Sequence, residues 1–173
     1  MEKEDILEKI KKASSEEYVT KWDSDGKIGS LKKKSNIDKG KKSKASGGAF
    51  EIRVRKNLEE KGWIIDKWSN NIDLETGSIH SAKRKYNPFS KAMVIGTGFP
   101  DFIAFQKMGE FHKVIGVEVK VNGTLSLEEK KKCRFYLDKM VFSEILIAKK
   151  KMEMGKILVE YIPFEEIEKR MRV

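Results

Sequence analysis

A nine-residue segment that ends at Val121 constrains the fold more than any other part of the chain. It contains four valines and one isoleucine, and such a run of β-branched residues favours an extended strand. Because alternate side chains of a strand face opposite ways, we expect Val117, Val119 and Val121 in the core. Glu118 and Lys120 then share the other face. The chain must therefore build a sheet that buries one face of this strand and places two charged groups together on the other.

The segments around this strand predict an alternation of helices and strands. Apolar residues repeat every four positions in residues 49–61, which predicts a helix, and Gly62 follows as its C-terminal stop. Strands are expected at 63–65, 101–106, 113–121, 145–148 and 156–162, and further helices at 125–140, with Ser126 as N-cap, and at 163–171. This order predicts an α/β fold with a central mixed β-sheet flanked by helices.

The N-terminal region differs in composition from the rest of the chain. Residues 27–44 hold eight lysines and one acidic residue, and residues 24–48 contain few apolar side chains. So few apolar groups cannot offset the entropy lost when a chain becomes ordered. We therefore expect residues 1–46 to form a short amphipathic helix and a flexible basic N-terminal arm, and residues 47–173 to form the folded domain. A solvated linker without a binding role explains the lysines equally well.

Residues 69–91 are polar and rich in turn-forming residues, which predicts a long loop inserted in the domain. Its sequence Lys83-Arg84-Lys85-Tyr86 combines basic groups with an aromatic ring, a combination that suits phosphate contact and base stacking. A merely solvated loop is an equally good interpretation.

Charge and cysteine content narrow the class of protein. The net charge of +10 favours a polyanionic partner, although it does not distinguish DNA, RNA and anionic lipid. Cys133 is the only cysteine, which excludes an internal disulfide and argues against a structural zinc site. No apolar run approaches the length of a membrane span, and the first residues do not resemble a signal peptide. We expect an intracellular, cytoplasmic protein without a membrane partner.

A carboxylate pair is expected where two strands meet. Asp101 follows Pro100 at the start of one predicted strand, and a tight turn at Gly109 would bring it within reach of Glu118. Two carboxylates and the Lys120 ammonium would then meet, and oxygen ligands of this kind suit Mg²⁺ or Mn²⁺. Such a site can hydrolyse a phosphodiester, with the lysine orienting water or neutralising negative charge. The alternative is an Asp in a turn and an exposed Glu–Lys ion pair, worth only about 0–1 kcal/mol.

These residues match the pattern of a known family. Pro100-Asp101 followed by Glu118-Val119-Lys120 resembles the motif of the PD-(D/E)XK nuclease superfamily. Gly48-Ala49-Phe50-Glu51 looks like the helix that carries an additional acidic residue in that superfamily. The resemblance covers about residues 47–162, and its layout is closest to archaeal Holliday junction resolvases.

The resemblance implies a restriction endonuclease-like core and a role for each matching residue. Asp101, Glu118 and the carbonyl group of Val119 would bind Mg²⁺. Lys120 would assist the attacking water, and Glu51 would hold a further water or a second metal. These implied catalytic residues are Glu51, Asp101, Glu118 and Lys120.

The sequence departs from the family in two places. Related nucleases often carry a glutamine on the helix after the lysine strand, where this chain has Glu129, so Glu129 is left out of the expected catalytic set. The insertion at 69–91 is longer than in the resolvases. Because substrate choice depends on such peripheral segments, specificity for four-way junctions does not follow from the shared core.

We therefore expect a Mg²⁺-dependent DNA endonuclease, acting in recombination, repair, restriction or phage DNA processing. A junction resolvase would have to be a homodimer, because it cuts a symmetric substrate twice. The alternatives are a non-catalytic nucleic-acid-binding module on the same fold and a basic scaffold of a larger assembly. The residues expected to contact DNA are Lys32, Lys33, Lys34, Lys41, Lys42, Lys83, Arg84, Lys85, Lys130, Lys131 and Arg134.

Overall fold

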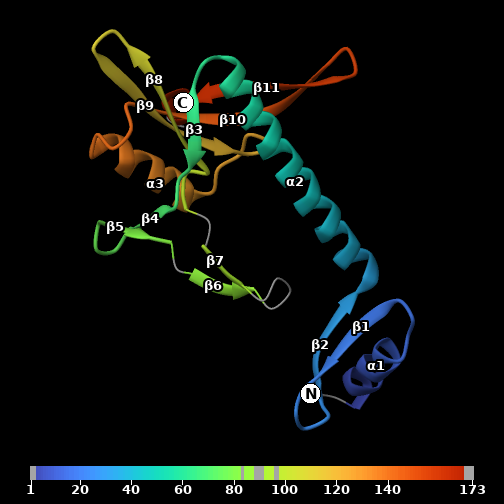
Figure 1. Cartoon of the computed structure of the whole chain (residues 1–173). Helices are drawn as coiled ribbons and strands as arrows, with labels where there is room; N and C mark the ends of the chain where they lie inside the picture. The colour runs from blue at the N-terminus through green and yellow to red at the C-terminus, as the bar shows by residue number, and fades with distance from the viewer. Residues whose placement is uncertain (1–2, 83, 88–91, 96–97, 170–173) are drawn as a thin grey trace. The chain divides into compact units, whose positions relative to one another are not determined.

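The computed structural model describes residues 3–82, 84–87, 92–95 and 98–169 (Figure 1). It divides the chain into two units, Met1–Gly48 and Ala49–Val173. The boundary between them falls within the long helix α2 (Lys34–Glu60). Each unit is described by itself below.

The second unit contains a five-stranded mixed β-sheet (Figure 1). In chain order its strands are β3 (Ile64–Lys67), β8 (Phe102–Met108), β9 (Phe111–Val119), β10 (Glu144–Glu153) and β11 (Lys156–Pro163). They lie in the order β11-β10-β9-β8-β3, with β9 and β10 parallel and the other neighbours antiparallel. The α/β class with a central mixed sheet is therefore confirmed, as are the five strands expected for it.

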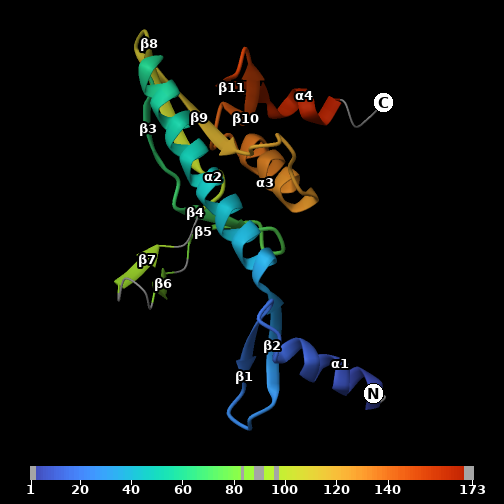
Figure 2. The same ribbon diagram turned by 90° about the vertical axis from the view of Figure 1, so that its right-hand side faces the viewer.

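Helices pack against both faces of this sheet. The parallel strands β9 and β10 are joined through helix α3 (Leu127–Asp138), since parallel neighbours need a crossover connection. Phe50, Val54 and Leu58 of α2 are buried in a cluster with β8 and β9 on one face. Side chains of α3 and of helix α4 (Phe164–Lys169) are buried in a second cluster on the other face. In Figure 2 the C-terminal part of α2 and helix α3 accordingly lie on opposite sides of the strands.

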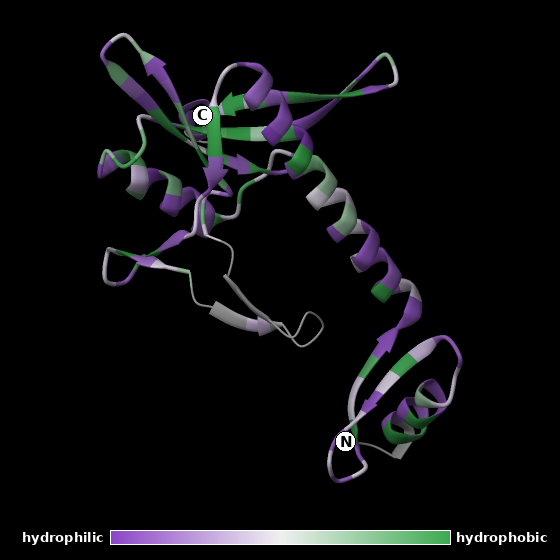
Figure 3. Cartoon of the chain, viewed as in Figure 1, coloured by the Kyte–Doolittle hydropathy of each residue, from purple (hydrophilic) through white to green (hydrophobic). Residues whose placement is uncertain are grey.

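The alternation of side chains along β10 explains how one strand contributes to both clusters. Ile145 and Ile147 belong to the cluster under α3, whereas Leu146 and Ala148 face the cluster under α2. A strand covered on both faces has to be apolar on both, as this stretch of β10 is. Figure 3 shows the resulting hydrophobic stretch in β10.

The N-terminal unit forms helices and strands instead of the expected flexible arm. It contains helix α1 (Lys3–Ala13) and an antiparallel hairpin of β1 (Tyr18–Trp22) and β2 (Ile28–Lys33), and α2 begins immediately afterwards. Residues 28–48 thus form strand β2 and the first half of α2. The physical reason is that lysine is a good helix former, and a helix already nucleated at its apolar end extends at little cost per residue.

The described residues of the range 69–91 do not form the expected long loop, and residues 83 and 88–91 lie outside the described part of the chain. Short antiparallel strands occur here instead: β4 (Asn70–Asp73) pairs with β5 (Ser78–Ser81), and β6 (Arg84–Asn87) pairs with β7 (Ala92–Ile95), which follows this range. Asp73 organises the first turn, since its Oδ1 accepts a hydrogen bond from the N–H of Glu75 at 2.9 Å, and Gly77 adopts a positive φ of 65°. The turn-forming residues therefore separate short strands, and Ile72 of β4 is buried in the cluster under α3.

Gly116 gives a test of packing within the sheet. A Cβ at this position of β9 would lie 2.8 Å from Cγ of Pro100 and 3.1 Å from Cδ2 of Phe142. Because such contacts force neighbours apart, we expect Gly116→Ala to lower the free energy of unfolding by about 1–3 kcal/mol, measured by urea denaturation. Gly48→Ala in α2, where a Cβ meets no atom within 4 Å, is the control and should not destabilise. A Gly116→Ala variant as stable as the wild type would contradict this packing.

Candidate functional site

The antiparallel pairing of β8 and β9 brings Asp101 and Glu118 together. Phe102 lies opposite Val117, so Asp101, one residue before β8, lies beside Glu118. The N–H of Asp101 donates to Oε2 of Glu118 at 3.1 Å, and the N–H of Val119 donates to Oδ2 of Asp101 at 2.9 Å. The turn expected at Gly109 is present, with a φ of 65°. The expected meeting of the two carboxylates is therefore confirmed.

Burial raises the pKa of both carboxylates. Glu118 is only 4% exposed and is the buried charged residue of the described core. Burial raises the pKa of Glu118 to about 7, and the negative charge of Asp101 contributes to this rise. Burial also raises the pKa of Asp101, although the hydrogen bond from Val119 opposes the rise. A buried and a half-buried carboxylate side by side disfavour each other's charge, so a cation bound between them would be stabilising.

The Lys120 ammonium lies at the edge of this pair. Its Nζ is 2.9 Å from Oε1 of Glu118 and 2.6 Å from Oε1 of Glu129. Burial alone would lower the pKa of Lys120, but the hydrogen bonds to Glu129 and Glu118 outweigh it and raise this pKa. Lys120 is therefore a firmly protonated cation. Val121, expected in the core, is instead 40% exposed because β9 ends at Val119.

Glu51 belongs to the edge of the site rather than to the carboxylate pair. Its negative charge contributes to the raised pKa of Asp101, so the two groups interact, but its own Oε2 pairs with Nζ of Lys67 at 3.7 Å. In the part of the chain that the structure describes, no three His, Cys, Asp or Glu side chains form a group that could hold a metal ion. Glu51 thus does not complete a cluster of three carboxylates there.

The donors that do converge fit a hard divalent cation. Mg²⁺ in phosphate-processing sites is commonly held by one or two carboxylates and keeps waters and substrate oxygens as its other ligands. Asp101 and Glu118 supply such a pair, and the backbone N–H of Val119 donates a hydrogen bond to Asp101. The pair therefore fits Mg²⁺ or Mn²⁺ better than a soft metal that needs sulfur or imidazole ligands.

Glu129 is the residue that the sequence interpretation set aside and that the structure brings into the site. It is the third residue of α3, and it forms a reciprocal capping box with Ser126. The sequence Ser126-Leu127-Glu128-Glu129 carries this capping pattern and could have placed Glu129 at the helix start. Its contact with Lys120 depends on where that helix start lies relative to β9. Cys133, expected as a core residue, is fully buried.

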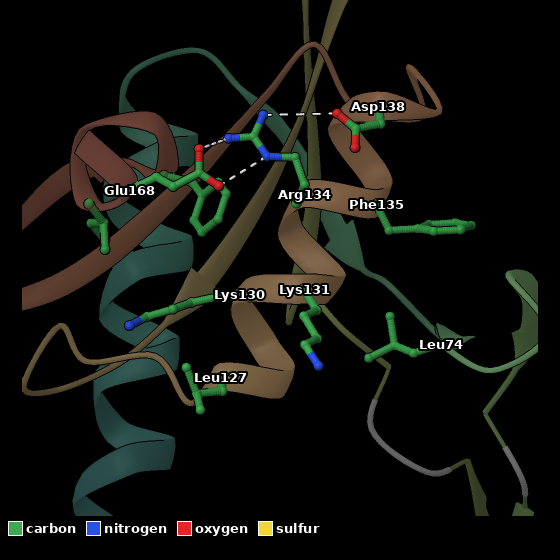
Figure 4. A pocket seen from close by; sticks show the side chains of 10 residues that line it. Leu74, Leu127, Lys130, Lys131, Arg134, Phe135, Asp138 and Glu168 are labelled. Carbon is green, nitrogen blue, oxygen red and sulfur yellow. Dashed lines mark hydrogen bonds and ion pairs between the residues drawn. The ribbon is translucent and has the colours of Figure 1, made fainter. Parts of the chain in front are cut away.

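The basic residues of α3 lie in a different environment from the carboxylate pair. Lys130, Lys131 and Arg134 line a groove of about 410 Å³ between α3, α4 and the β4–β5 turn (Figure 4). Nε of Arg134 donates to Oε1 of Glu168 at 3.1 Å, and the guanidinium also lies 3.9 Å from Asp138. Two carboxylates already neutralise Arg134. It is therefore a weaker candidate for DNA contact than its sequence position indicates.

The other basic candidates are distributed over the first unit and the β6–β7 hairpin. Lys32 and Lys33 lie in β2, and Lys34, Lys41 and Lys42 lie in the first half of α2, all exposed. Within this group, Lys33 pairs with Glu17 at 3.5 Å and Lys41 with Asp38 at 3.9 Å. Lys83 lies outside the described residues. Arg84 and Lys85 are described only as backbone of β6.

Comparison with known proteins leaves the geometry as the guide to function. No protein-family model matches the chain, and neither the curated proteins nor the solved structures give a significant match. Across the described ranges, no helix combines the length and the apolar character needed to cross a membrane.

Proposed function

We propose that this protein is a Mg²⁺-dependent DNA endonuclease of the PD-(D/E)XK type. The observation that carries the proposal is the pair formed by the buried Glu118 and the half-buried Asp101, with the Lys120 ammonium 2.9 Å from Glu118. A buried carboxylate with a pKa near 7 beside a second acid destabilises the metal-free fold, which a bound cation would relieve. The five-stranded mixed sheet with helices on both faces is compatible with a restriction endonuclease-like core.

The carboxylate pair and Lys120 have different roles in this proposal. Asp101 and Glu118 hold the cation, which when bound stabilises negative charge on the phosphate and makes water more acidic. The Lys120 ammonium orients the attacking water or neutralises charge that develops on the phosphoryl oxygens. Because hydrogen bonds to Glu129 and Glu118 raise the pKa of Lys120, it acts as a charged donor rather than as a base.

The net charge of +10 supports a polyanionic substrate, and exposed lysines of the first unit are the groups we propose to bind its backbone. Replacing Lys32, Lys34 and Lys42 together by Gln should weaken DNA binding and reduce the slope of log K against log salt by about 2–3 units. Fluorescence anisotropy from low to moderate salt measures this slope. Lys→Arg at the same three positions should preserve it, and an unchanged slope in the Gln variant would exclude these lysines as phosphate contacts.

The proposal is tested by incubating the protein with Mg²⁺ and labelled linear duplex, single-stranded, flap and four-way-junction DNA. Cleavage that EDTA abolishes would support an endonuclease. Paired symmetric nicks confined to the junction would support a resolvase that acts as a homodimer. Restriction, repair or phage-type activity would instead cut the other substrates. Salt-sensitive binding without cleavage in Mg²⁺ or Mn²⁺ would overturn the proposal in favour of a non-catalytic binding module.

A further inference from the structure

The Glu129 carboxylate is held at both of its oxygens. Its Oε1 lies 2.6 Å from Nζ of Lys120, and its Oε2 accepts the backbone N–H of Ser126 at 2.7 Å. The Oγ of Ser126 in turn accepts the N–H of Glu129 at 3.3 Å. The backbone N–H of Ser126 therefore holds the carboxylate at Oε2, and this leaves Oε1 in contact with the lysine ammonium.

Lys120 has two carboxylate partners in the described part of the chain, and they differ in what else they do. Glu118 belongs to the carboxylate pair, where its Oε2 already accepts the N–H of Asp101. Negative charge that Glu118 shares with a cation is no longer fully available to Lys120. Glu129 makes no hydrogen bond to Asp101 or Glu118 among those the structure gives, so its contact with Lys120 does not compete with cation binding.

We propose that Glu129 is a positioning residue that anchors the Lys120 ammonium from helix α3 while Glu118 holds the cation. The effect of Glu129 on catalysis rests on the proposed nuclease function. Its effect on the position of Lys120 does not depend on that function. An ionised carboxylate suits this role better than a neutral amide, because hydrogen bonds between charged partners are roughly twice as strong.

Four variants separate positioning from folding. Glu129→Ala removes the anchor, and Glu129→Gln keeps its shape and a neutral acceptor. Ser126→Ala removes the Oγ of the cap but retains the backbone N–H that holds Glu129. Glu128→Ala removes a neighbouring carboxylate that is 67% exposed and pairs with Lys132 instead. The last two serve as controls for helix stability and for loss of negative charge.

We expect Glu129→Ala to lower kcat about 10- to 100-fold while KM for DNA stays within about twofold, because a displaced catalytic group costs rate rather than affinity. Glu129→Gln should recover a large part of this loss. Ser126→Ala and Glu128→Ala should keep the wild-type kcat. A Glu129→Ala variant with unchanged kcat, or an equal loss in Ser126→Ala, would overturn the proposal.

A second readout does not depend on activity. A lysine ammonium held by two carboxylates exchanges its protons slowly enough to give a ¹H–¹⁵N signal, which Lys120→Arg would assign by its disappearance. With saturating Mg²⁺, we expect this signal in the wild type, Ser126→Ala and Glu128→Ala, and its loss in Glu129→Ala. Absence from the wild type, or persistence in Glu129→Ala, would overturn the anchoring role. A protein that shows the expected signals but cuts no DNA would contradict the nuclease proposal alone.

Discussion

Asp101→Asn is expected to lower Mg²⁺-dependent DNA cleavage by at least about 10³-fold. The substitution keeps the size of the side chain and an oxygen that can accept the N–H of Val119, but it removes one of the two negative charges of the carboxylate pair. Loss of about 4 kcal/mol of charge stabilisation in the transition state corresponds to this factor, at about 1.4 kcal/mol for each tenfold change in rate. Single-turnover nicking of supercoiled plasmid measures the effect.

A matched control lies on the neighbouring strand. Asp66 of β3 is exposed, and its carboxylate contacts only the backbone N–H of Lys67 in the hydrogen bonds that the structure gives. Asp66→Asn changes the charge by the same amount and should cut DNA at the wild-type rate. Both variants should retain salt-sensitive DNA binding. Wild-type cleavage by Asp101→Asn would show that the reaction uses another site.

Glu118→Gln is expected to stabilise the metal-free protein at pH 8 by about 2–3 kcal/mol and to change its stability little at pH 5. Burial, with the Asp101 charge, raises the pKa of Glu118 from 4.5 to about 7 in the folded state. The folded state therefore holds this proton more tightly than the unfolded state does. The stability linked to Glu118 is present below about pH 4.5 and is lost as the pH rises through 7, at about 1.4 kcal/mol per pKa unit. Glutamine remains neutral throughout.

Urea denaturation in EDTA at the two pH values measures this difference. Adding Mg²⁺ at pH 8 supplies the control, because a cation bound by the pair should stabilise the wild type and should have little effect on Glu118→Gln. If Glu118→Gln were less stable than the wild type at both pH values, the ion pair with Lys120 would outweigh the cost of burying the charge. That outcome would contradict the raised pKa.

The strands of the central sheet could be predicted because each carries a local pattern that its neighbours reinforce. The alternation of residues 113–121 and the apolar stretch 145–148 both correspond to strands of the sheet. The lysine-rich first half of α2 could not be predicted from polarity alone. In α2 the apolar side chains that fix the helix begin at Phe50, and the lysine-rich turns before it contain little core-forming pattern. The prediction of a loop at residues 69–91 failed for a related reason, since turn residues between very short strands resemble a continuous loop.

The carboxylate pair could be predicted because strand alternation and one turn are sufficient to bring Asp101 to Glu118. The contact between Lys120 and Glu129 could not, since it joins the end of a strand to the start of a helix through a loop. The glutamine found at this place in the nucleases that the sequence resembles obscured the contact further. For Glu51, the helix could be predicted from the sequence, but the ion pair with Lys67 could not, because this contact depends on how α2 lies against β3.

The proposed role of Asp101 and Glu118 as a cation site is tested most directly by isothermal titration of Mg²⁺ into the metal-free protein. A saturable binding isotherm at or below millimolar Mg²⁺ is expected for the wild type, because burial raises the pKa of both carboxylates and a cation relieves their mutual repulsion. The isotherm should disappear in Asp101→Asn and persist in Asp66→Asn. Heats of dilution alone from the wild type, or an isotherm that Asp101→Asn leaves unchanged, would contradict the site.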